Sequence, residues 1–338
     1  MSLVHLPPYR LEFGPSALHL GVDWGVSCYG VPALWHRTEG AGATVAVIDS
    51  GVADHKHLEV ADHRNFTSDS EHTDTLGHGT HVAGIIASTG GRYRGIAPKA
   101  RILSLKALGH SGFGSNTHVA QAVHHAADVN ADIICMSLGG PTQSEEVSDA
   151  IKQARKKGVI IVCAAGNDGG SVNWPAALPE TVAVGAVNSE GQACEFSSRG
   201  RQITVAAPGE RITSTWLNND YATLSGTSMA TPFVAGVLAL YVSAWKGRDD
   251  RPNCFDVLRE TCTDVGEQGR DSLYGWGLID PKKIKQTKLP KYKAVKNTAY
   301  ITNIHNYGEI DHAIHEIEKV LGFNKKLQPI NYIEEVEK

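Results

Sequence analysis

The sequence predicts an α/β protein with three layers, in which a mostly parallel central sheet is covered by helices on both faces. From about residue 44, continuous apolar runs of strand length alternate with amphipathic segments of roughly 10–15 residues. This is the pattern of parallel strands that are buried on both faces and joined by helices. The chain also carries 35 glycines and is 41% hydrophobic, as expected of a folded protein with many tight turns.

Each expected strand is a short, mainly apolar run that both faces of a sheet can bury. In chain order the strands are 44–49, 101–107, 132–138, 159–165, 181–187 and 203–206. Each expected helix has apolar residues at helical spacing. The helices are 78–88, 116–128, 145–157, 228–245 and 253–263. The longest apolar run, 233–245, is shorter than the roughly 20 residues of a membrane span, so we expect a buried core helix there.

The two ends of the chain do not follow this alternation. Residues 1–20 contain a Pro-Pro pair and little periodicity, and residues 286–338 begin with a segment rich in lysine and proline. We therefore predict an N-terminal extension at 1–20, a central domain at 21–285 and a C-terminal extension at 286–338. The last is expected to be a small βαβ-like appendix or a docking tail.

Charge and cysteine content restrict the function and the compartment. The 338 residues carry a net charge of −4, whereas a dedicated nucleic-acid-binding protein is usually strongly basic. The N-terminus lacks the basic start and apolar run of a secretory signal. Cys135 and Cys163 lie in buried-strand patterns, where cysteine acts as a small hydrophobe. We therefore expect free thiols, a cytoplasmic location, and no nucleic-acid or membrane partner.

Three reactive side chains stand at the ends of expected elements. Asp49 ends the first strand, His78 begins the first helix and Ser228 begins the longest helix. In a parallel sheet, functional groups gather at the carboxyl ends of strands and at the starts of the helices that follow. The three side chains are therefore expected to meet.

These residue types form the set that nucleophilic catalysis requires. A serine hydroxyl is a weak nucleophile until a base removes its proton, and histidine titrates near neutral pH. A carboxylate on the other ring nitrogen fixes the tautomer and stabilises the imidazolium. Beside Ser228, Gly226 is expected to adopt a backbone angle that a side chain would forbid. Pro232 is expected in the first turn of the helix, where its missing N–H costs least.

Asn167 follows the fourth expected strand in a glycine-rich loop. Its side-chain N–H and the backbone N–H of Ser228 would together form an oxyanion hole.

These motifs resemble those of the subtilisin-like serine proteases, the subtilases, and occur in the order Asp, His, Ser. The resemblance covers the central domain and implies the subtilisin-like three-layer fold. It also implies a serine endopeptidase that hydrolyses peptide bonds through an acyl-enzyme intermediate. In this interpretation Asp49 orients His78, His78 is the general base and acid, Ser228 is the nucleophile, and Asn167 lines the oxyanion hole.

The same resemblance implies a cleft that binds protein or peptide substrates as extended strands. One edge of the cleft would be Gly112, Phe113 and Gly114, and the opposite edge Ser137, Leu138 and Gly139. The pocket for the residue before the scissile bond would be walled by Leu138, Gly139, Ala165 and Gly166, with Asn173 near its floor.

Residues Leu6, Pro7, Pro8 and Tyr9 resemble a motif of the intracellular subtilisins of bacilli. In that group a short N-terminal segment crosses the active site and blocks it until the segment is removed. The resemblance therefore implies a self-processing zymogen with residues 1–20 as its inhibitory segment, and a protein able to form homodimers. Proline would resist cleavage because it lacks an N–H and fixes φ, which distorts the extended pose and moves the scissile carbonyl.

No cofactor is expected to be required. The family commonly binds calcium at two sites, which the resemblance would allow here. However, the corresponding stretches 55–58, 89–94 and 201–206 lack the carboxylates that calcium prefers. Weak or absent dependence on calcium is therefore expected.

Several histidines have an ordinary interpretation beside a functional one. His81 is expected to be a packed helix residue and not a second base. His55, His57 and His63 could bind a metal, but we expect exposed histidines in a polar loop. A pair at His312 and His315 has helical spacing without an evident third ligand.

Other functions stay open at this point. A subtilase can be catalytically silent or locked, and act as a scaffold or regulator. The extension at 286–338 could serve dimerisation or target docking. A serine esterase is disfavoured because the Gly-x-Ser-x-Gly elbow is absent around Ser228.

Overall fold

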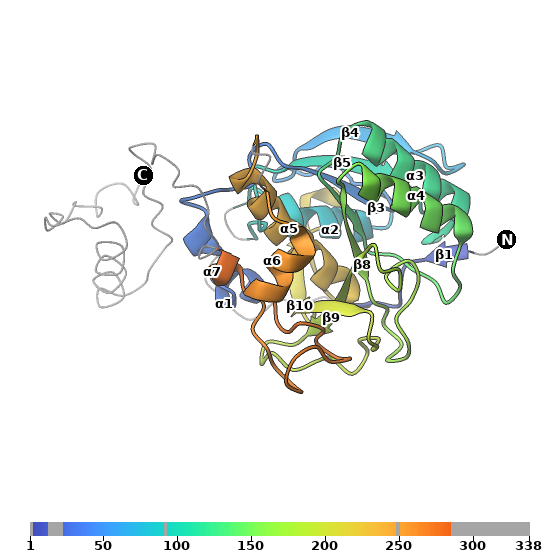
Figure 1. Ribbon diagram of the computed structural model, residues 1–338. Helices are drawn as coiled ribbons and strands as arrows, with labels where there is room; N and C mark the ends of the chain where they lie inside the picture. The colour runs from blue at the N-terminus through green and yellow to red at the C-terminus, as the bar shows by residue number, and fades with distance from the viewer. Residues whose placement is uncertain (1–2, 13–22, 91–92, 248–250, 285–338) are drawn as a thin grey trace, which may run out of the picture. The chain divides into compact units, whose positions relative to one another are not determined.

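The structure is a computed structural model that describes residues 3–12, 23–90, 93–247 and 251–284. A seven-stranded parallel sheet lies at its centre, in the order β10-β9-β8-β7-β3-β5-β4 (Figure 1). Its strands are β3 (Thr44–Asp49), β4 (Val60–Asn65), β5 (Arg101–Lys106), β7 (Ile133–Met136), β8 (Ile160–Ala164), β9 (Val182–Val187) and β10 (Ile203–Pro208). The predicted α/β fold with a mostly parallel sheet is confirmed.

Burial of both sheet faces explains the continuous apolar runs. Along β3, Val45 and Val47 face one core while Ala46 and Ile48 face the other. Strands β8, β9 and β10 are buried along their whole length. Because each residue of such a strand faces one of two cores, the sequence shows no alternation of polar and apolar positions.

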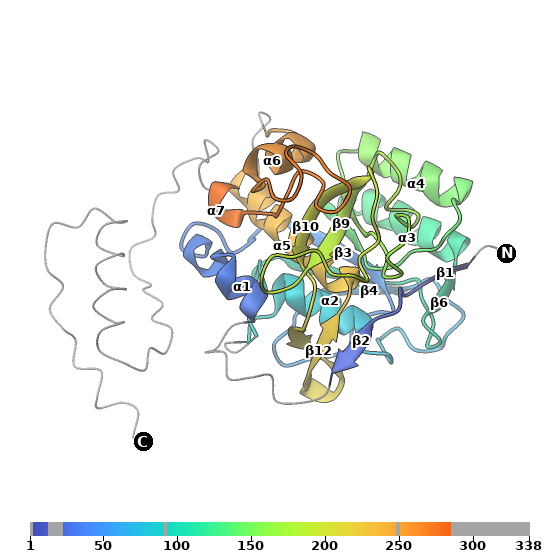
Figure 2. The same cartoon turned by 90° about the horizontal axis from the view of Figure 1, so that it is seen from below.

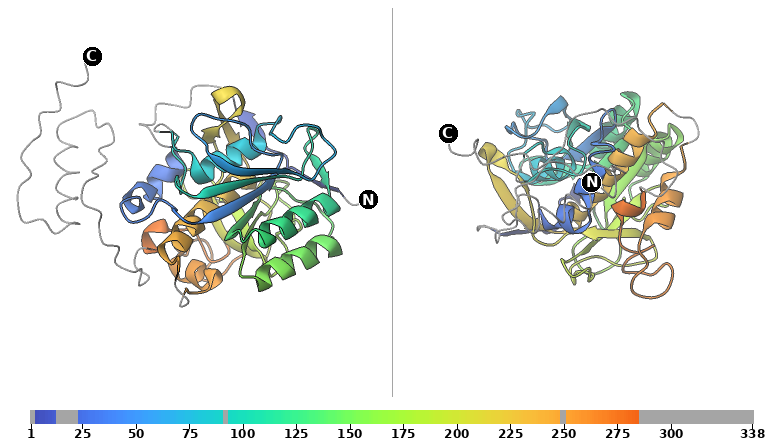
Figure 3. Two further views of the ribbon diagram at one scale, coloured as in Figure 1. Left: turned by 90° about the horizontal axis from the view of Figure 1, so that it is seen from above. Right: turned by 90° about the vertical axis from the view of Figure 1, so that its left-hand side faces the viewer.

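Helices cover both faces of this sheet (Figure 3). α3 (Asn116–Asp128) and α4 (Glu145–Lys156) pack into one core, and α2 (His78–Ala87) and α5 (Thr227–Ala244) into the other. By length and composition α5 could span a membrane, but it is buried within the fold. It is the core helix that the sequence predicted. The shorter helices are α1 (Trp24–Cys28), η1 (Val31–Leu34), η2 (Leu217–Asn219), α6 (Cys254–Thr261) and α7 (Pro281–Ile284).

Two smaller sheets both include the N-terminal segment (Figure 2). β1 (Leu3–His5) pairs antiparallel with β6 (Phe113–Ser115). β11 (Ile212–Thr215) and β12 (Tyr221–Ser225) form a hairpin, and β12 also pairs antiparallel with β2 (Arg10–Glu12). Apart from β6, the sequence analysis missed these strands because three to five residues are too few to show a period. The edge strand β4 was missed because it is polar and partly exposed.

The chain divides into two compact units, residues 1–294 and 295–338. The C-terminal extension at 286–338 lies outside the described residues, so its expected βαβ character stays a prediction. All six cysteines are free, and only Cys28 is exposed, in agreement with the expected free thiols.

Candidate active site

Asp49, His78 and Ser228 are each placed by the end of a regular element. Asp49 is the last residue of β3, His78 is the first of α2 and Ser228 is the second of α5. All three are fully buried. β3 is an inner strand between β5 and β7. Its carboxyl end therefore lies among the carboxyl ends of the neighbouring parallel strands.

Asp49 and His78 form a direct pair. His78 Nδ1 lies 2.8 Å from Asp49 Oδ1, which also accepts a hydrogen bond from Ser50 N. Because a carboxylate only accepts, Nδ1 carries the proton and the lone pair of the neutral ring lies on Nε2. His78 Nε2 is buried and has no hydrogen-bond partner among the described residues. The atom expected to act as the base is therefore unused in this state.

Ser228 exchanges hydrogen bonds with Ser137. The Ser137 hydroxyl donates to the Ser228 carbonyl at 2.9 Å, and the Ser228 hydroxyl donates to the Ser137 carbonyl at 3.3 Å. Pro232 explains why the Ser228 carbonyl is free. The expected position of Pro232 in the first helical turn is wrong, because α5 begins at Thr227 and Pro232 lies in the second turn. Its missing N–H leaves the carbonyl four residues earlier without a helical donor, and Ser137 fills that place.

Asn167 follows β8 in the chain and is hydrogen-bonded to the first residue of α5. Its Oδ1 accepts hydrogen bonds from the backbone N–H and the hydroxyl of Thr227, both at 2.8 Å. This leaves Nδ2 to donate outward, and it donates to the Pro8 carbonyl at 2.7 Å. The expectation for Gly226 is wrong, because its φ of 162° is extended backbone. Glycine is required there because a Cβ would lie 2.8 Å from Asn167 Nδ2.

Asp74 is a buried carboxylate that the sequence analysis missed. It accepts hydrogen bonds from Leu76 N and Gly77 N, from the backbone and hydroxyl of Thr80, and from the Ser50 hydroxyl. The Ser50 hydroxyl also lies 3.2 Å from Asp49 Oδ1. Burial raises the pKa of Asp74, and its hydrogen bonds oppose this shift. Asp74 thus fixes the first turn of α2 and, through Ser50, the carboxylate beside His78.

The signal for Asp74 in the sequence is weak. It stands four residues before His78 in a polar loop, whereas the capping residues that sequence patterns reveal lie directly before a helix. The capping position itself is Gly77, whose φ is 91°.

The two predicted cleft edges enclose the N-terminal segment. β1 pairs with β6 on one side, and on the other His5 and Gly139 exchange two backbone hydrogen bonds of 3.0 Å. Leu6 N donates to Gly112 O at 3.0 Å. Residues 3–6 therefore lie as a strand between the edges 112–114 and 137–139.

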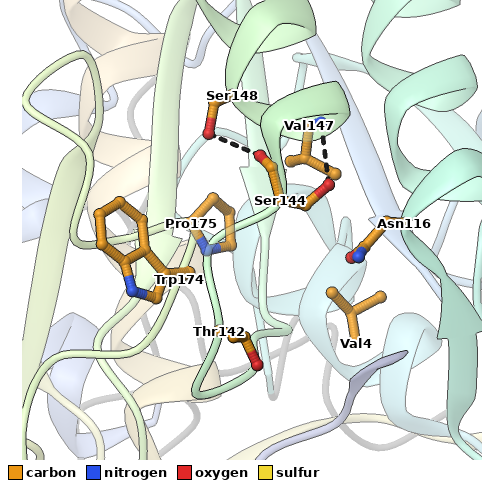
Figure 4. Close-up of a pocket in the computed structure, with 8 residues that line it drawn as sticks. All are labelled: Val4, Asn116, Thr142, Ser144, Val147, Ser148, Trp174 and Pro175. Carbon is orange, nitrogen blue, oxygen red and sulfur yellow. Dashed lines mark hydrogen bonds between the residues drawn. The ribbon is translucent and has the colours of Figure 1, made fainter. Parts of the chain in front are cut away.

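Val4 is the buried anchor of this strand. Its side chain faces inward and lines a small pocket between α3, α4 and the loop before β9 (Figure 4). The other lining residues are Asn116, Thr142, Ser144, Val147, Ser148, Trp174 and Pro175.

Beyond the strand, the segment passes directly over the reactive groups. The Pro8 carbonyl is held by Asn167, and the Tyr9 ring lies 5.1 Å from the His78 ring. Burial, followed by the charges of Asp49 and Asp74, raises the pKa of Tyr9. The expectation that proline moves the scissile carbonyl stays a prediction, and the Pro8 oxygen itself lies within hydrogen-bond distance of Asn167 Nδ2.

The residues expected around the primary pocket lie together. Asn173 N donates to Ala165 O at 2.8 Å, and a Cβ on Gly166 would lie 2.6 Å from Asn173 Nδ2. Leu138 and Ala165 are fully buried. The φ of Gly166 is 116°, which disfavours any other residue at this position.

The remaining histidines have structural contacts. His81 is fully buried, and its Nε2 lies 3.1 Å from Ile212 O and 3.0 Å from Ala222 O, which agrees with a packed helix residue. The expectation of exposed histidines is wrong for His55, which is buried and contacts Asp220 O through Nε2. His57 and His63 are partly buried. His312 and His315 lie outside the described residues.

In the described part of the chain, no group of three or more His, Cys, Asp or Glu side chains is arranged to hold a metal ion. The stretch at 201–206 runs into the fully buried strand β10. Weak or absent dependence on calcium stays a prediction.

Comparison with known proteins gives concordant matches. The sequence profile of the subtilase family matches residues 40–277. An intracellular serine protease of Paenibacillus polymyxa is 41% identical over 253 residues, covering 70% of this chain and 77% of that protein. The minor extracellular protease Epr of Bacillus subtilis is 40% identical over 269 residues, covering 77% of this chain and 41% of that protein. Subtilisin Savinase of Lederbergia lenta is 37% identical over 267 residues, covering 77% of this chain and 97% of that protein.

The burial of His81 predicts a specific acid sensitivity of the fold. Burial, followed by the nearby His78, lowers the pKa of His81 to about 3, so between pH 6.5 and 3 the unfolded chain binds a proton that the folded chain excludes. The free energy of unfolding therefore decreases as the pH is lowered through this window, by about 2 kcal/mol from pH 6.5 to pH 5. His81→Gln keeps an N–H donor for the two carbonyls but cannot titrate, so it should lose this part of the dependence.

Urea unfolding at pH 7 and pH 5 tests this, with both proteins carrying Ser228→Ala. Burial raises the pKa of Asp23 to about 6, which acts in the opposite direction but equally in both proteins. An identical loss of stability in the two proteins would show that His81 is not responsible.

Proposed function

The chain belongs to the subtilase family and is a serine-type endopeptidase, and on that premise we propose that Asp49, His78 and Ser228 are its catalytic triad and that its N-terminal segment keeps it latent. The observation that carries the proposal is the Pro8 carbonyl, which accepts a 2.7 Å hydrogen bond from Asn167 beside the three residues. A peptide group of the chain itself thus lies where a substrate carbonyl would react.

In the proposed mechanism, His78 Nε2 takes the proton of the Ser228 hydroxyl as its oxygen attacks the substrate carbonyl carbon. The Asp49 carboxylate, 2.8 Å from Nδ1, stabilises the imidazolium that forms. The imidazolium then donates the proton to the leaving amine and an acyl-enzyme remains. Water, deprotonated by the same nitrogen, attacks the acyl group and releases Ser228.

Charge on the substrate oxygen would be stabilised by Asn167 Nδ2. Because Thr227 occupies Asn167 Oδ1 with two hydrogen bonds, the amide is oriented before substrate arrives. Preorganised donors of this kind cost no reorganisation during reaction, and losing one typically lowers turnover by about 10²–10³-fold.

Substrates would bind as the N-terminal strand does, between the edges 112–114 and 137–139. Backbone hydrogen bonds to Gly112 and Gly139 give affinity that is independent of sequence. Pockets beside the strand then select side chains, with Asn173 and Gly166 facing the residue before the scissile bond.

Latency would follow from occupancy of the whole cleft by residues 3–12. The pairing of His5 with Gly139 is antiparallel, so it aligns residue 7 with Ser137. Neither Pro7 nor Pro8 has an N–H to donate to the Ser137 carbonyl, and the Ser228 hydroxyl donates to that carbonyl instead. The nucleophile is then engaged away from the base, whose Nε2 has no hydrogen-bond partner among the described residues. A peptide with an N–H at this position would compete for the Ser137 carbonyl and release the hydroxyl.

The alternative, a permanently locked subtilase that acts as a scaffold or regulator, is favoured by this same engagement of Ser228. The two proposals differ in whether the segment ever leaves. A cytoplasmic location is also part of the proposal, supported by the intracellular serine protease among the relatives. Homodimer formation stays a prediction.

Removal of residues 1–20 should raise peptidase activity by about tenfold or more. A segment that occupies the cleft for over about 90% of the time leaves less than a tenth of the molecules competent. The intact mass of purified full-length protein, followed over time, should show loss of the N-terminal segment, whereas Ser228→Ala should stay whole. Unchanged activity of the truncated protein would remove the inhibitory role.

Replacing Pro7 and Pro8 together by Ala should speed loss of the N-terminal segment by about two- to tenfold, the effect of one hydrogen bond of roughly 0.5–1.5 kcal/mol. The double substitution supplies an N–H for the Ser137 carbonyl. Leu3→Ala is the control, because it changes an exposed side chain of the same segment without adding an N–H. Equal acceleration by the double substitution and by Leu3→Ala, measured by intact mass, would exclude a specific role of the prolines.

Excess EDTA should shift the thermal unfolding midpoint of the Ser228→Ala protein by less than about 2 °C, which is about the effect of 1 kcal/mol on a protein of this size. The reason is the absence of a carboxylate cluster from the described residues. A large fall that added calcium reverses would instead reveal a structural ion.

A further inference from the structure

Phe113 is an exposed aromatic residue on a wall of the cleft. Its side chain is 51% exposed, and the other large apolar side chains exposed among the described residues are Leu3 and Val129. Leu3 lies in the strand that pairs with Phe113's own strand, so two of the three exposed side chains belong to the β1–β6 ladder.

The register of this ladder determines what Phe113 contacts. His5 pairs with Phe113, Val4 with Gly114 and Leu3 with Ser115. Because side chains alternate along a strand, Val4 points inward and is buried, while Leu3 and His5 share the outward face with Phe113. The rings of His5 and Phe113 are 5.6 Å apart and inclined at 49°.

The backbone holds His5 in this place independently of its side chain. Its N–H and its carbonyl are each hydrogen-bonded to Gly139 at 3.0 Å. Any peptide bound in the same ladder therefore has one residue fixed between Gly139 and Phe113. The side chain of that residue would stand in water if Phe113 were small, and would then contribute no selectivity.

We propose that Phe113 is a specificity-determining residue, which favours substrates with an aromatic or imidazole side chain at the place that His5 takes. This rests on the proposed function, in which substrates bind as the N-terminal strand does. Cross-strand aromatic pairs are favoured over alanine by an amount that corresponds to about a two- to tenfold preference.

A simpler role would be that Phe113 only packs against the N-terminal segment. In that case Phe113→Ser would speed loss of the segment but leave the selectivity of the processed enzyme unchanged. The selectivity of the processed protein therefore distinguishes the two roles.

The test uses full-length chain that has processed itself to constant activity. Fluorescence-quenched decapeptides carry Phe, His or Ala at the third or at the fourth position before the scissile bond. Both positions are varied because Pro7 and Pro8 lie outside the ladder. The pairing fixes which residue lies beside Phe113, but it does not fix how many residues separate His5 from the scissile bond. Phe113→Ser is compared with Val129→Ser, which removes an exposed apolar side chain just beyond the far end of α3, a helix about 20 Å long.

At one of the two positions, kcat/KM of wild type should be about two- to tenfold higher for Phe or His than for Ala. This ratio should fall to about one in Phe113→Ser and persist in Val129→Ser. A ratio near one in wild type, or an equal ratio in all three proteins, would overturn the inference while leaving the endopeptidase intact. Failure of processed wild type to cleave any decapeptide would instead remove the proposed function, and the inference with it.

Discussion

The parallel pairing of β8, β7 and β3 determines where each reactive group of the site can lie. The carboxyl ends of these neighbouring strands bring Asn167, Ser137 and Asp49 to one edge of the sheet. Side-chain hydrogen bonds then attach the start of α5 to this edge, from Thr227 to Asn167 and from Ser137 to the Ser228 carbonyl. The positions of the proposed nucleophile and the proposed oxyanion donor are thus set by the sheet, and the loops between need only connect them.

The sequence predicted those features that repeat or that occupy a fixed place in an element. The apolar runs of the central strands predicted the sheet, and the reactive residues at element ends predicted the meeting of Asp49 and His78. Features that depend on single contacts could not be predicted in this way. Asp74 is recognised only when its loop is folded around it, and the close approach of Gly226 to Asn167 has no local signature.

Pro232 shows how a local rule can mislead. Proline is common in the first helical turn, where its missing N–H has least effect. Here it lies one turn later, and the carbonyl that it leaves free is satisfied from β7 through Ser137. The hydrogen bond that the helix lacks is thereby replaced by one from a neighbouring strand, which helical spacing in the sequence does not predict. Strands of three residues, such as β1 and β2, escape prediction for a related reason, since only their partners define them.

The pairing of β2 with β12 has a consequence for how the N-terminal segment leaves. In the proposed latent state, residues 3–12 act as a bivalent ligand with one ladder on β6 and another on β12, and each ladder holds the other at a high effective concentration. A cut between the ladders would end this coupling unequally. The upstream fragment becomes a free monovalent peptide that can diffuse away, whereas the downstream strand stays tethered beside β12 and competes with the leaving-group side of each substrate. A chain cut at that point would be a partly inhibited intermediate, and only a cut beyond Glu12 would free both halves of the cleft.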